Sequence, residues 1–292
     1  IRDRDDKLQS ARGNPGLFDE FRKSIARKTR GFLAPEYNIR CIEAAVNLPF
    51  DEGIAVEQKL FMELMSGPQS RAQQYFFFAE RQAAKIPDVP RDTPERPLNK
   101  VGVIGAGTMG GGISMNMANV GIPVTIIETQ QEALDRGLGI IRKNYENTAK
   151  KGRISAADVE TRCGLITGSL DMQDLADCDL VIEAVYESLD LKKEIFTKLD
   201  GIVKAGAILA SNTSALDINQ IAAVTARPES VIGLHFFSPA NVMKLLEIVR
   251  GDHTAKDVIK TSMSFAKRIN KVAALVGVCP GFVGNRILFQ RQ

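Results

Sequence analysis

The residues best suited to acid–base chemistry are a histidine and a glutamate that lie in two neighbouring apolar segments. The chain has only two histidines, His235 and His253. His235 ends the apolar run 231–235, and Glu247 lies inside a second apolar run, 245–249. A carboxylate in the middle of an apolar strand is costly unless it is paired, and an imidazole brought beside it by a turn supplies that partner. Such a carboxylate would fix the histidine tautomer and stabilise the imidazolium.

Two interpretations of this pair stay open on these residues alone. A buried His/Glu pair can be purely structural, without any role in proton transfer. His253 lies in a Gly-Asp-His-Thr turn, which is typical of a solvated side chain. A catalytic role for His235 and Glu247 becomes the better interpretation when a cofactor site lies upstream in the same chain.

A glycine-rich turn upstream has the pattern of a dinucleotide site. An apolar strand, 101–104, leads into the motif GAGTMG at 105–110. A helical pattern follows, and then a second apolar strand, 123–127, which is followed at once by Glu128. A lone GxGxxG motif is weak evidence, because a glycine-rich turn can occur without a ligand. Here the strand, glycines, helix, second strand and acidic residue occur together, which favours NAD binding.

Each part of this motif has a physical role in holding a dinucleotide. Gly105 permits the tight turn out of the strand, Gly107 lets the backbone approach a pyrophosphate, and Gly110 lets the helix pack closely on the sheet. The free N–H groups and the positive dipole at the helix N-terminus attract the phosphates. Glu128, about 20 residues further on, would accept hydrogen bonds from the ribose hydroxyls and repel the 2′-phosphate of NADP.

Composition limits the remaining possibilities. The chain has 292 residues, 44% of them hydrophobic and 25% charged, which is ordinary for a globular protein. A net charge of +3 gives no reason to expect nucleic acid as a partner, and no apolar run is long enough to span a bilayer. The four cysteines are scattered, so we expect reduced thiols and neither disulfides nor a metal site. The chain does not begin with Met, and both ends look cut, so we expect a fragment of a longer polypeptide.

The order of patterns along the chain predicts helices first and an α/β domain afterwards. After an irregular start at 1–16, helices are expected at 17–30, 39–47, 51–67 (with Asp51 as N-cap) and 68–85. Residues 86–98 are rich in proline and predict an extended linker. Strands and helices then alternate, which predicts a doubly wound, Rossmann-type parallel sheet. The expected strands are 101–104, 123–127, 163–167, 179–183, 207–210 and 231–235, and the expected helices are 108–120, 130–150, 188–204 and 217–224.

Further polar candidates follow the ends of predicted strands, where ligands bind in doubly wound sheets. The segment Ser211–Ser214 follows one strand and can present hydroxyls to a substrate or simply cap the next helix. Glu187 and Lys192 follow another strand and can meet the nicotinamide ribose or form a surface ion pair. Asn285 follows a Pro-Gly turn and can direct its amide at the same site.

Five motifs in this order resemble the L-3-hydroxyacyl-CoA dehydrogenase family from about Leu98 to the end: GAGTMG, SNTS, HFFSP, MKLLEIV and PGFVGNR. The resemblance implies His235 as the catalytic base, Glu247 as its partner, and Ser214 and Asn285 as substrate contacts. The family more often has asparagine, beside the nicotinamide, where this chain has Ser238. The NAD contacts implied in this way are Gly105, Gly107, Thr108, Met109, Gly110, Glu128, Glu187, Lys192, Ser214 and Ser238.

The first 97 residues resemble the stretch that joins hydratase/isomerase and dehydrogenase in multifunctional β-oxidation enzymes. The expected domains are the helical C-terminal part of a crotonase-type hydratase/isomerase domain (1–85), the linker (86–98), the NAD-binding domain (99–278) and the start of an all-α domain (279–292). In the family that helical domain completes the substrate cleft and often the dimer interface. The hydratase's catalytic glutamates lie upstream of this segment in the family, so no hydratase residue is assigned.

The resemblance implies NAD-dependent oxidation of a (3S)-3-hydroxyacyl-CoA to the 3-ketoacyl-CoA in fatty-acid β-oxidation, within an enzyme that is also an enoyl-CoA hydratase, a lyase. The alternative is an NAD-binding fragment without turnover, because the helical domain is missing. A small hydroxy acid is a second alternative, although related enzymes with such substrates usually use a lysine base. The expected partners are an acyl-CoA substrate and a second copy or a thiolase-type protein through the missing regions. The bacterial cytoplasm is expected rather than the peroxisome.

Overall fold

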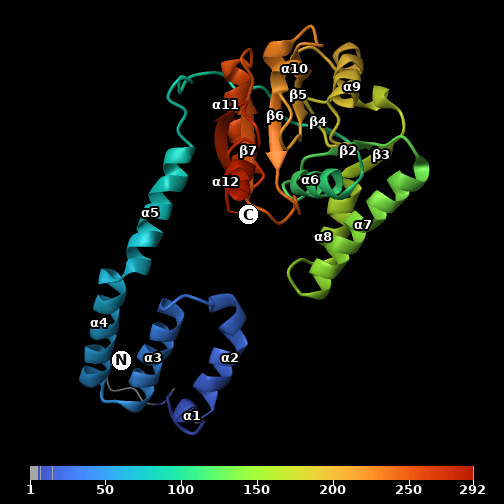
Figure 1. Cartoon of the computed structure of the whole chain (residues 1–292). Coiled ribbons are helices and arrows are strands. Elements are labelled where there is room, and N and C mark those ends of the chain that lie inside the picture. Colours follow the sequence, from blue (N-terminus) through green and yellow to red (C-terminus); the bar gives the residue numbers. More distant parts are fainter. Residues whose placement is uncertain (1–5, 7, 15, 292) are drawn as a thin grey trace. The chain divides into compact units, whose positions relative to one another are not determined.

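The computed structural model describes residue 6 and residues 8–14 and 16–291. The chain divides into two compact units, Ile1–Gln82 and Ala83–Gln292 (Figure 1). The first unit is helical and the second contains the sheet. All of the predicted site residues belong to the second unit.

The first unit consists of amphipathic helices that bury few side chains. Arg22 joins two of them through ion pairs to Glu36 and Glu43, at 2.9 and 2.8 Å. Within the predicted irregular start, residues 9–12 form a short helical turn. The expected N-cap at Asp51 is wrong, since the helix begins one residue earlier, after Pro49. The helices are α1 (Gln9–Arg12), α2 (Leu17–Thr29), α3 (Ala34–Asn47), α4 (Phe50–Ser66) and α5 (Pro68–Ala83).

The second unit is built on an 8-stranded sheet with the order β3-β2-β1-β4-β5-β6-β7-β8. The strands are β1 (Val101–Ile104), β2 (Val124–Ile127), β3 (Ile166–Ser169), β4 (Leu180–Glu183), β5 (Ile208–Ser211), β6 (Val231–Phe236), β7 (Leu245–Arg250) and β8 (Val272–Gly277). Strands β1 to β6 are parallel, which confirms the predicted doubly wound sheet. β7 pairs antiparallel with β6 and parallel with β8.

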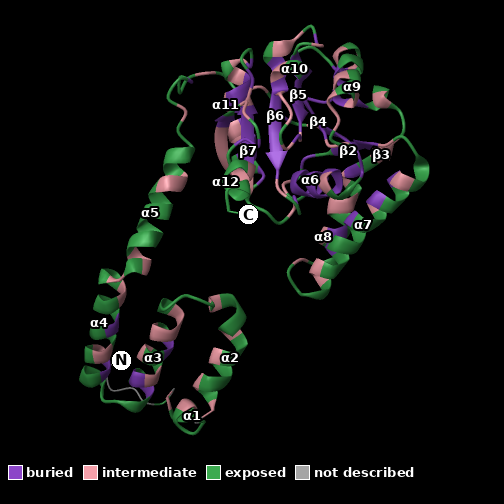
Figure 2. Ribbon diagram, viewed as in Figure 1, coloured by how far each residue is buried: buried purple, intermediate pink, exposed green. Residues whose placement is uncertain are grey.

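Helices cover both faces of this sheet, and its central strands are buried (Figure 2), whereas the edge strands β3 and β8 are only partly buried. The helices are α6 (Thr108–Ala118), α7 (Gln131–Lys150), α8 (Ala156–Gly164), α9 (Leu189–Ile202), α10 (Ile218–Ala222), α11 (Lys256–Arg268) and α12 (Gly284–Phe289). Because successive side chains of a strand point to opposite faces, Ile182 packs in one core cluster and Val181 in another. Helices α6, α7, α8 and α11 contribute to the first cluster, and α9 and α10 to the second.

The largest difference from the sequence prediction concerns the strand expected at 163–167. Residues 163 and 164 end helix α8, and the strand begins at Ile166. Helix α8 starts with a capping box, in which Ser155 Oγ accepts from the Asp158 N–H and the Asp158 carboxylate accepts from the Ser155 N–H. Helices α8 and α11 and strand β8 were not predicted from the pattern of apolar residues.

The proline-rich segment 86–98 lies along α11. Arg96 anchors it through an ion pair from Nε to Asp257 at 2.8 Å and a hydrogen bond from Nη1 to Ser230 Oγ at 2.9 Å. The Arg96 N–H also donates to Thr261 Oγ1 at 2.8 Å. This end of the linker is therefore tied to the sheet unit by specific polar contacts.

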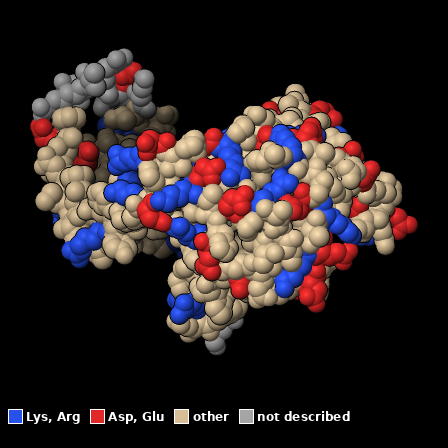
Figure 3. All heavy atoms as spheres, turned by 90° about the horizontal axis from the view of Figure 1, so that it is seen from above, with Lys and Arg blue, Asp and Glu red and all other residues tan. Residues whose placement is uncertain are grey.

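The surface of the described residues carries both signs of charge. On the face shown in Figure 3, lysine and arginine side chains are interspersed with aspartate and glutamate. In the part of the chain that the structure describes, no helix has the length and apolarity needed to cross a membrane. The cysteines are free thiols, and no cluster of potential metal ligands is found among the described residues.

We expect Arg96→Ala to destabilise the second unit by about 2 kcal/mol, because Asp257 and Ser230 lose a partly buried charged partner. Urea unfolding followed by circular dichroism measures this loss. The matched control is Arg91→Ala, an exposed arginine of the same segment. Equal effects of the two substitutions would contradict the anchoring role.

Candidate active site

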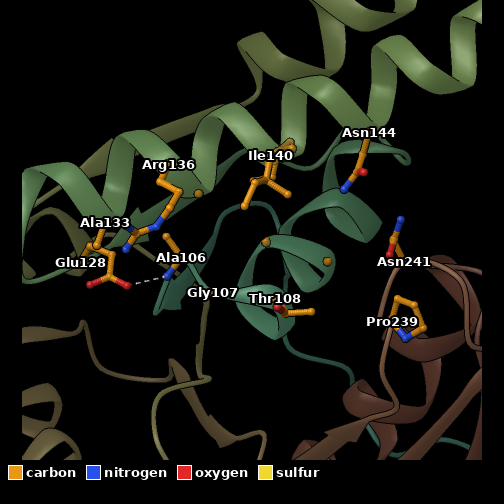
Figure 4. A pocket seen from close by; sticks show the side chains of 14 residues that line it. Ala106, Gly107, Thr108, Glu128, Ala133, Arg136, Ile140, Asn144, Pro239 and Asn241 are labelled. Carbon is orange, nitrogen blue, oxygen red and sulfur yellow. Dashed lines mark hydrogen bonds between the residues drawn. The ribbon is translucent and has the colours of Figure 1, made fainter.

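A pocket of about 300 Å³ opens at the N-terminus of α6. Figure 4 shows Glu128, Ala106 and Arg136 at one end and Pro239 and Asn241 at the other. The walls come from the β1–α6 turn, Glu128 after β2, residues 133–144 of α7 and the loop after β6. The lining residues are Ala106, Gly107, Thr108, Gly111, Gly112, Glu128, Ala133, Arg136, Gly137, Ile140, Ile141, Asn144, Pro239 and Asn241.

The glycines of the β1–α6 turn are required by close backbone approach. Gly105 has φ of +101°, and a β-carbon there would lie 2.8 Å from the carbonyl oxygen of Ala184. A β-carbon on Gly110 would lie 1.8 Å from the carbonyl oxygen of Gly105, so α6 can pack this closely only with glycine. Gly107 has no atom within 4 Å of its β-carbon position and lines the pocket, which leaves its backbone open to a ligand.

The carboxylate of Glu128 is held beside this turn. Its Oε1 accepts a hydrogen bond from the Ala106 N–H at 3.0 Å, and its Oε2 accepts from the Thr129 N–H at 2.9 Å. The carboxylate therefore has a fixed position in the pocket wall. Arg136, from α7, lines the same end of the pocket.

The second part of the site is the pair formed by His235 and Glu247. The two residues lie directly opposite each other in the antiparallel β6–β7 register, so their side chains share one face of the sheet. His235 Nδ1 lies 2.7 Å from Glu247 Oε2. His235 is 6% exposed and Glu247 is 1% exposed. Because the carboxylate accepts at this distance, Nδ1 carries a proton, and in the neutral imidazole Nε2 then keeps its lone pair.

The other oxygen of Glu247 binds the Pro-Gly-Phe-Val-Gly-Asn turn. Oε1 accepts from the Gly284 N–H at 2.7 Å and from the Val283 N–H at 3.0 Å. Burial alone would raise the pKa of Glu247, but the hydrogen bonds from His235, Gly284 and Val283 hold that pKa below its ordinary value. One buried carboxylate thus joins the histidine to the start of α12.

Two aromatic rings enclose the imidazole of His235. The ring centroids of Phe237 and Phe282 lie 4.4 and 5.8 Å from it. Phe282 is buried and has φ of +46°, an uncommon conformation for a residue other than glycine. The two rings limit access of water to the histidine.

A buried ion-pair network lies at the carboxyl ends of β4 and β5. Lys192 and Glu183 are both 0% exposed, and Lys192 Nζ lies 2.7 Å from Glu183 Oε1. Lys192 Nζ is also 3.4 Å from Glu187 Oε2. Ser211 Oγ donates to Glu183 Oε2 at 2.7 Å. From the sequence, the ion pair between Glu187 and Lys192 was considered as a surface contact. In the structure the side chain of Lys192 is completely buried.

Glu187 connects this network to the other predicted residues. Its Oε1 accepts from Thr213 Oγ1 at 2.7 Å and from the N–H and Oγ of Ser214 at 2.8 and 3.0 Å. Burial acts to raise the pKa of Glu187, but the hydrogen bonds from Thr213 and Ser214 and the charge of Lys192 lower it below its ordinary value. Asn285 Nδ2 donates to the Ser214 carbonyl at 3.4 Å.

Most predicted site residues thus fall into two groups, one around the β1–α6 turn and one around His235, Glu247 and Glu187. Glu247 joins His235 to the turn before Asn285, and Asn285 contacts Ser214 and through it the Glu187 network. Thr108 lines the pocket and Met109 packs against the core. Ser238 and His253 are exposed, and among the residues that the structure describes neither side chain forms a hydrogen bond, ion pair or ring contact.

Glu183 is part of the site and was not predicted from the sequence. It ends β4, and it accepts from Lys192, Ser211 and the Val185 N–H. The sequence does contain a signal for Glu183, since a glutamate at the end of an apolar, buried strand is costly without partners. The sequence also did not indicate Arg136 and Asn241 in the pocket wall, because helix α7 and a loop far along the chain supply them.

The chain is similar to proteins of known type. The family described as "3-hydroxyacyl-CoA dehydrogenase, NAD binding domain" matches residues 100–279. The peroxisomal bifunctional enzyme of Danio rerio is 44% identical over 282 residues, which is 94% of this chain and 38% of that protein. The fatty acid oxidation complex subunit alpha of Psychrobacter cryohalolentis is 36% identical over 258 residues, 88% of this chain and 36% of that protein. The chain spans less than two fifths of the length of these relatives.

Solved structures are similar to about two thirds of this chain. The crystal structure of (S)-3-hydroxybutyryl-CoA dehydrogenase from Ralstonia eutropha matches with a TM-score of 0.65 and 39% sequence identity. The match covers 66% of this chain and 68% of that one.

Substitution of the pocket carboxylate tests its role. We expect Glu128→Ser to raise the dissociation constant of NADH about tenfold, because one charged hydrogen-bond acceptor is lost. The preference for NADH over NADPH should shrink, since the 2′-phosphate no longer meets a carboxylate. Fluorescence titration with both cofactors measures this, with Glu132→Ser, an exposed glutamate of α7, as control. Unchanged NADH affinity in Glu128→Ser would refute the assignment.

The lowered pKa of Glu247 predicts how stability depends on pH. A carboxylate with a depressed folded-state pKa stabilises the fold above its unfolded pKa of about 4.3, and this contribution is lost as the pH falls through the folded value. Glu247→Gln should therefore destabilise the protein more at neutral pH than at about pH 3.5. Urea unfolding at both values measures the difference, with Glu229→Gln as exposed control. A pH-independent loss would contradict the prediction.

Proposed function

The chain belongs to the 3-hydroxyacyl-CoA dehydrogenase family, and we propose that it binds NAD at the start of α6 and oxidises a (3S)-3-hydroxyacyl-CoA to the 3-ketoacyl-CoA. The observation that carries this proposal is the buried His235–Glu247 pair at 2.7 Å. The pair lies at the same carboxyl edge of the parallel strands as the β1–α6 turn. In the sheet register, Ile104 of β1 pairs with Glu183 of β4, Glu183 with Ser211 of β5, and Ser211 with Gly233 of β6, two residues before His235.

The residues present fit NAD. Gly107 is open on the pocket side, and the tight contacts of Gly105 and Gly110 bring the N-terminus of α6 to the pocket. Helix N-terminal N–H groups bind phosphates. The fixed carboxylate of Glu128 provides acceptors for ribose hydroxyls at the other side of the turn. Gly107, Thr108 and Glu128 would hold the dinucleotide, and the remaining predicted contacts are Met109, Glu187, Lys192, Ser214 and Ser238.

The chain's own residues account for the proton transfer. Glu247 holds the proton on Nδ1 of His235, so Nε2 can accept the proton of the substrate hydroxyl. A bound NAD would supply the acceptor for the hydride from C3 of the substrate. The negative charge of Glu247 stabilises the imidazolium that forms, and the N–H groups of Gly284 and Val283 keep that carboxylate from rotating. Ser214 and Asn285 are proposed to contact the substrate.

The domain organisation remains a proposal as well. Residues 1–85 would belong to a hydratase/isomerase domain, 86–98 to the linker, 99–278 to the NAD-binding domain and 279–292 to the helical dehydrogenase domain. The alignment with bifunctional relatives over most of this chain supports this division. A second copy or a thiolase-type protein as partner also remains a prediction. The bacterial cytoplasm as location remains a prediction too, because the relatives include both peroxisomal and bacterial proteins.

Turnover of acetoacetyl-CoA with oxidation of NADH is the experiment that tests the function. NADH binding without turnover would favour the alternative of a binding fragment. Turnover that free CoA does not inhibit would favour a small hydroxy acid or its ketone as substrate.

We expect His235→Gln to lower kcat by about 10²- to 10⁴-fold, because the proposed base for the hydroxyl proton is removed. The NADH dissociation constant should stay nearly unchanged, since the histidine is not part of the pocket around the glycine turn. His253→Gln, which changes the exposed histidine, is the control and should keep full turnover. A parallel loss of NADH affinity in His235→Gln would remove the basis for its role as a base.

A further inference from the structure

The loop 237–244, which joins β6 to β7, connects the proposed catalytic histidine to the pocket. Pro239 and Asn241 of this loop line the pocket, and His235 lies just before it. The N–H groups of Val242 and Met243 donate to the Pro239 carbonyl at 2.9 and 3.0 Å. Val242 is 65% exposed and Met243 is 43% exposed, so apolar packing contributes little to fixing this turn.

Polar contacts from outside hold the loop. Lys271, which precedes β8, donates from Nζ to the carbonyls of Ala240 at 2.6 Å and Met243 at 2.7 Å. Asn116 of α6 donates from Nδ2 to the same Ala240 carbonyl at 3.0 Å. Ala240 is buried against α6, where a β-carbon on Gly112 would lie 3.1 Å from the β-carbon of Ala240. The loop is therefore fixed to the helix that starts at the glycine turn.

The charge of Lys271 is unusual for a residue with 9% exposure. Among the described residues its partners are backbone carbonyls and no ion pair with a carboxylate is found, and burial lowers its pKa below the ordinary lysine value. Burying an unpaired ammonium is costly, and an apolar side chain of similar size would fill the same space. The ammonium group of Lys271 donates hydrogen bonds to two backbone carbonyls, which a hydrocarbon side chain could not do.

We propose that Lys271 is a positioning residue, whose ammonium clamps the loop 237–244 onto α6 and thereby sets Pro239, Asn241 and the end of β6 relative to the glycine turn. Its effects on NADH affinity and on turnover rest on the proposed function, whereas its effect on the loop does not. Lys271 acts through the loop, without contact to the cofactor or the substrate.

The test compares Lys271→Met with Lys267→Met, an exposed lysine at the end of α11. Hydrogen exchange is measured at the amides of Val242 and Met243, which report the turn, and at Leu234 in the centre of β6. NADH affinity and kcat/KM with acetoacetyl-CoA are measured on the same samples. The methionine keeps the volume and removes the donor.

In Lys271→Met we expect exchange at Val242 and Met243 to accelerate about tenfold, with Leu234 unchanged. The NADH dissociation constant should rise, and kcat/KM should fall about tenfold if the proposed function is right. Lys267→Met should match the wild type in every measurement. Exchange that is unchanged at the loop, or faster by the same factor at Leu234, would overturn the positioning role.

Asn116→Ala provides a second variant that removes a donor to the same carbonyl. It should loosen the same two amides, and its effect should be less than additive with Lys271→Met, because both act on one turn. If Lys271→Met does not fold, the measurement on Asn116→Ala alone tests the proposal. Wild-type exchange rates at Val242 and Met243 in Asn116→Ala would then overturn the idea that polar contacts hold this loop on α6. Lack of turnover in the wild type would refute the proposed function and leave the loop measurements valid.

Discussion

The antiparallel contact between β6 and β7 is the constraint on which the candidate active site depends. It places Glu247 opposite His235 and buries the carboxylate to 1% exposure, so both of its oxygens need donors. One oxygen receives the imidazole and the other the two N–H groups of the turn before α12. A single desolvated charge therefore determines the orientation of the histidine and the path of the chain after β8.

The same principle operates at the ends of β4 and β5. Lys192 is completely buried and stays compatible with the fold because Glu183 pairs with it and Ser211 completes the network. Glu187 carries this network to Ser214, whose carbonyl accepts from Asn285. Buried charges thus connect side chains from three loops at one edge of the sheet, where the parallel strands end. Lys271 is a further buried cation, and backbone carbonyls are its partners.

Local patterns predicted the elements that are strongly apolar and clearly bounded. The strands around 101–104, 123–127, 179–183 and 231–235 were recognised because each is buried on both sides, as the sheet confirms. Strand β8 and helices α8 and α11 were missed. The residues of β8 are mostly half-buried. Helix α8 begins at the capping box of Ser155 and ends at Gly164, directly before the apolar residues that suggested a strand at 163–167.

The sequence by itself determined the β1–α6 turn and its glycines, the acidic residue at the end of β2, and the residue types of the His/Glu pair, because these features depend on neighbouring residues and on strand periodicity. Only the tertiary structure decided that Glu183 is the closer partner of Lys192, that Asn285 reaches Ser214, and that Lys271 and Asn116 meet at Ala240. These contacts join strands and loops that are far apart in the chain. Their partners follow from strand order and register, which residue spacing does not specify.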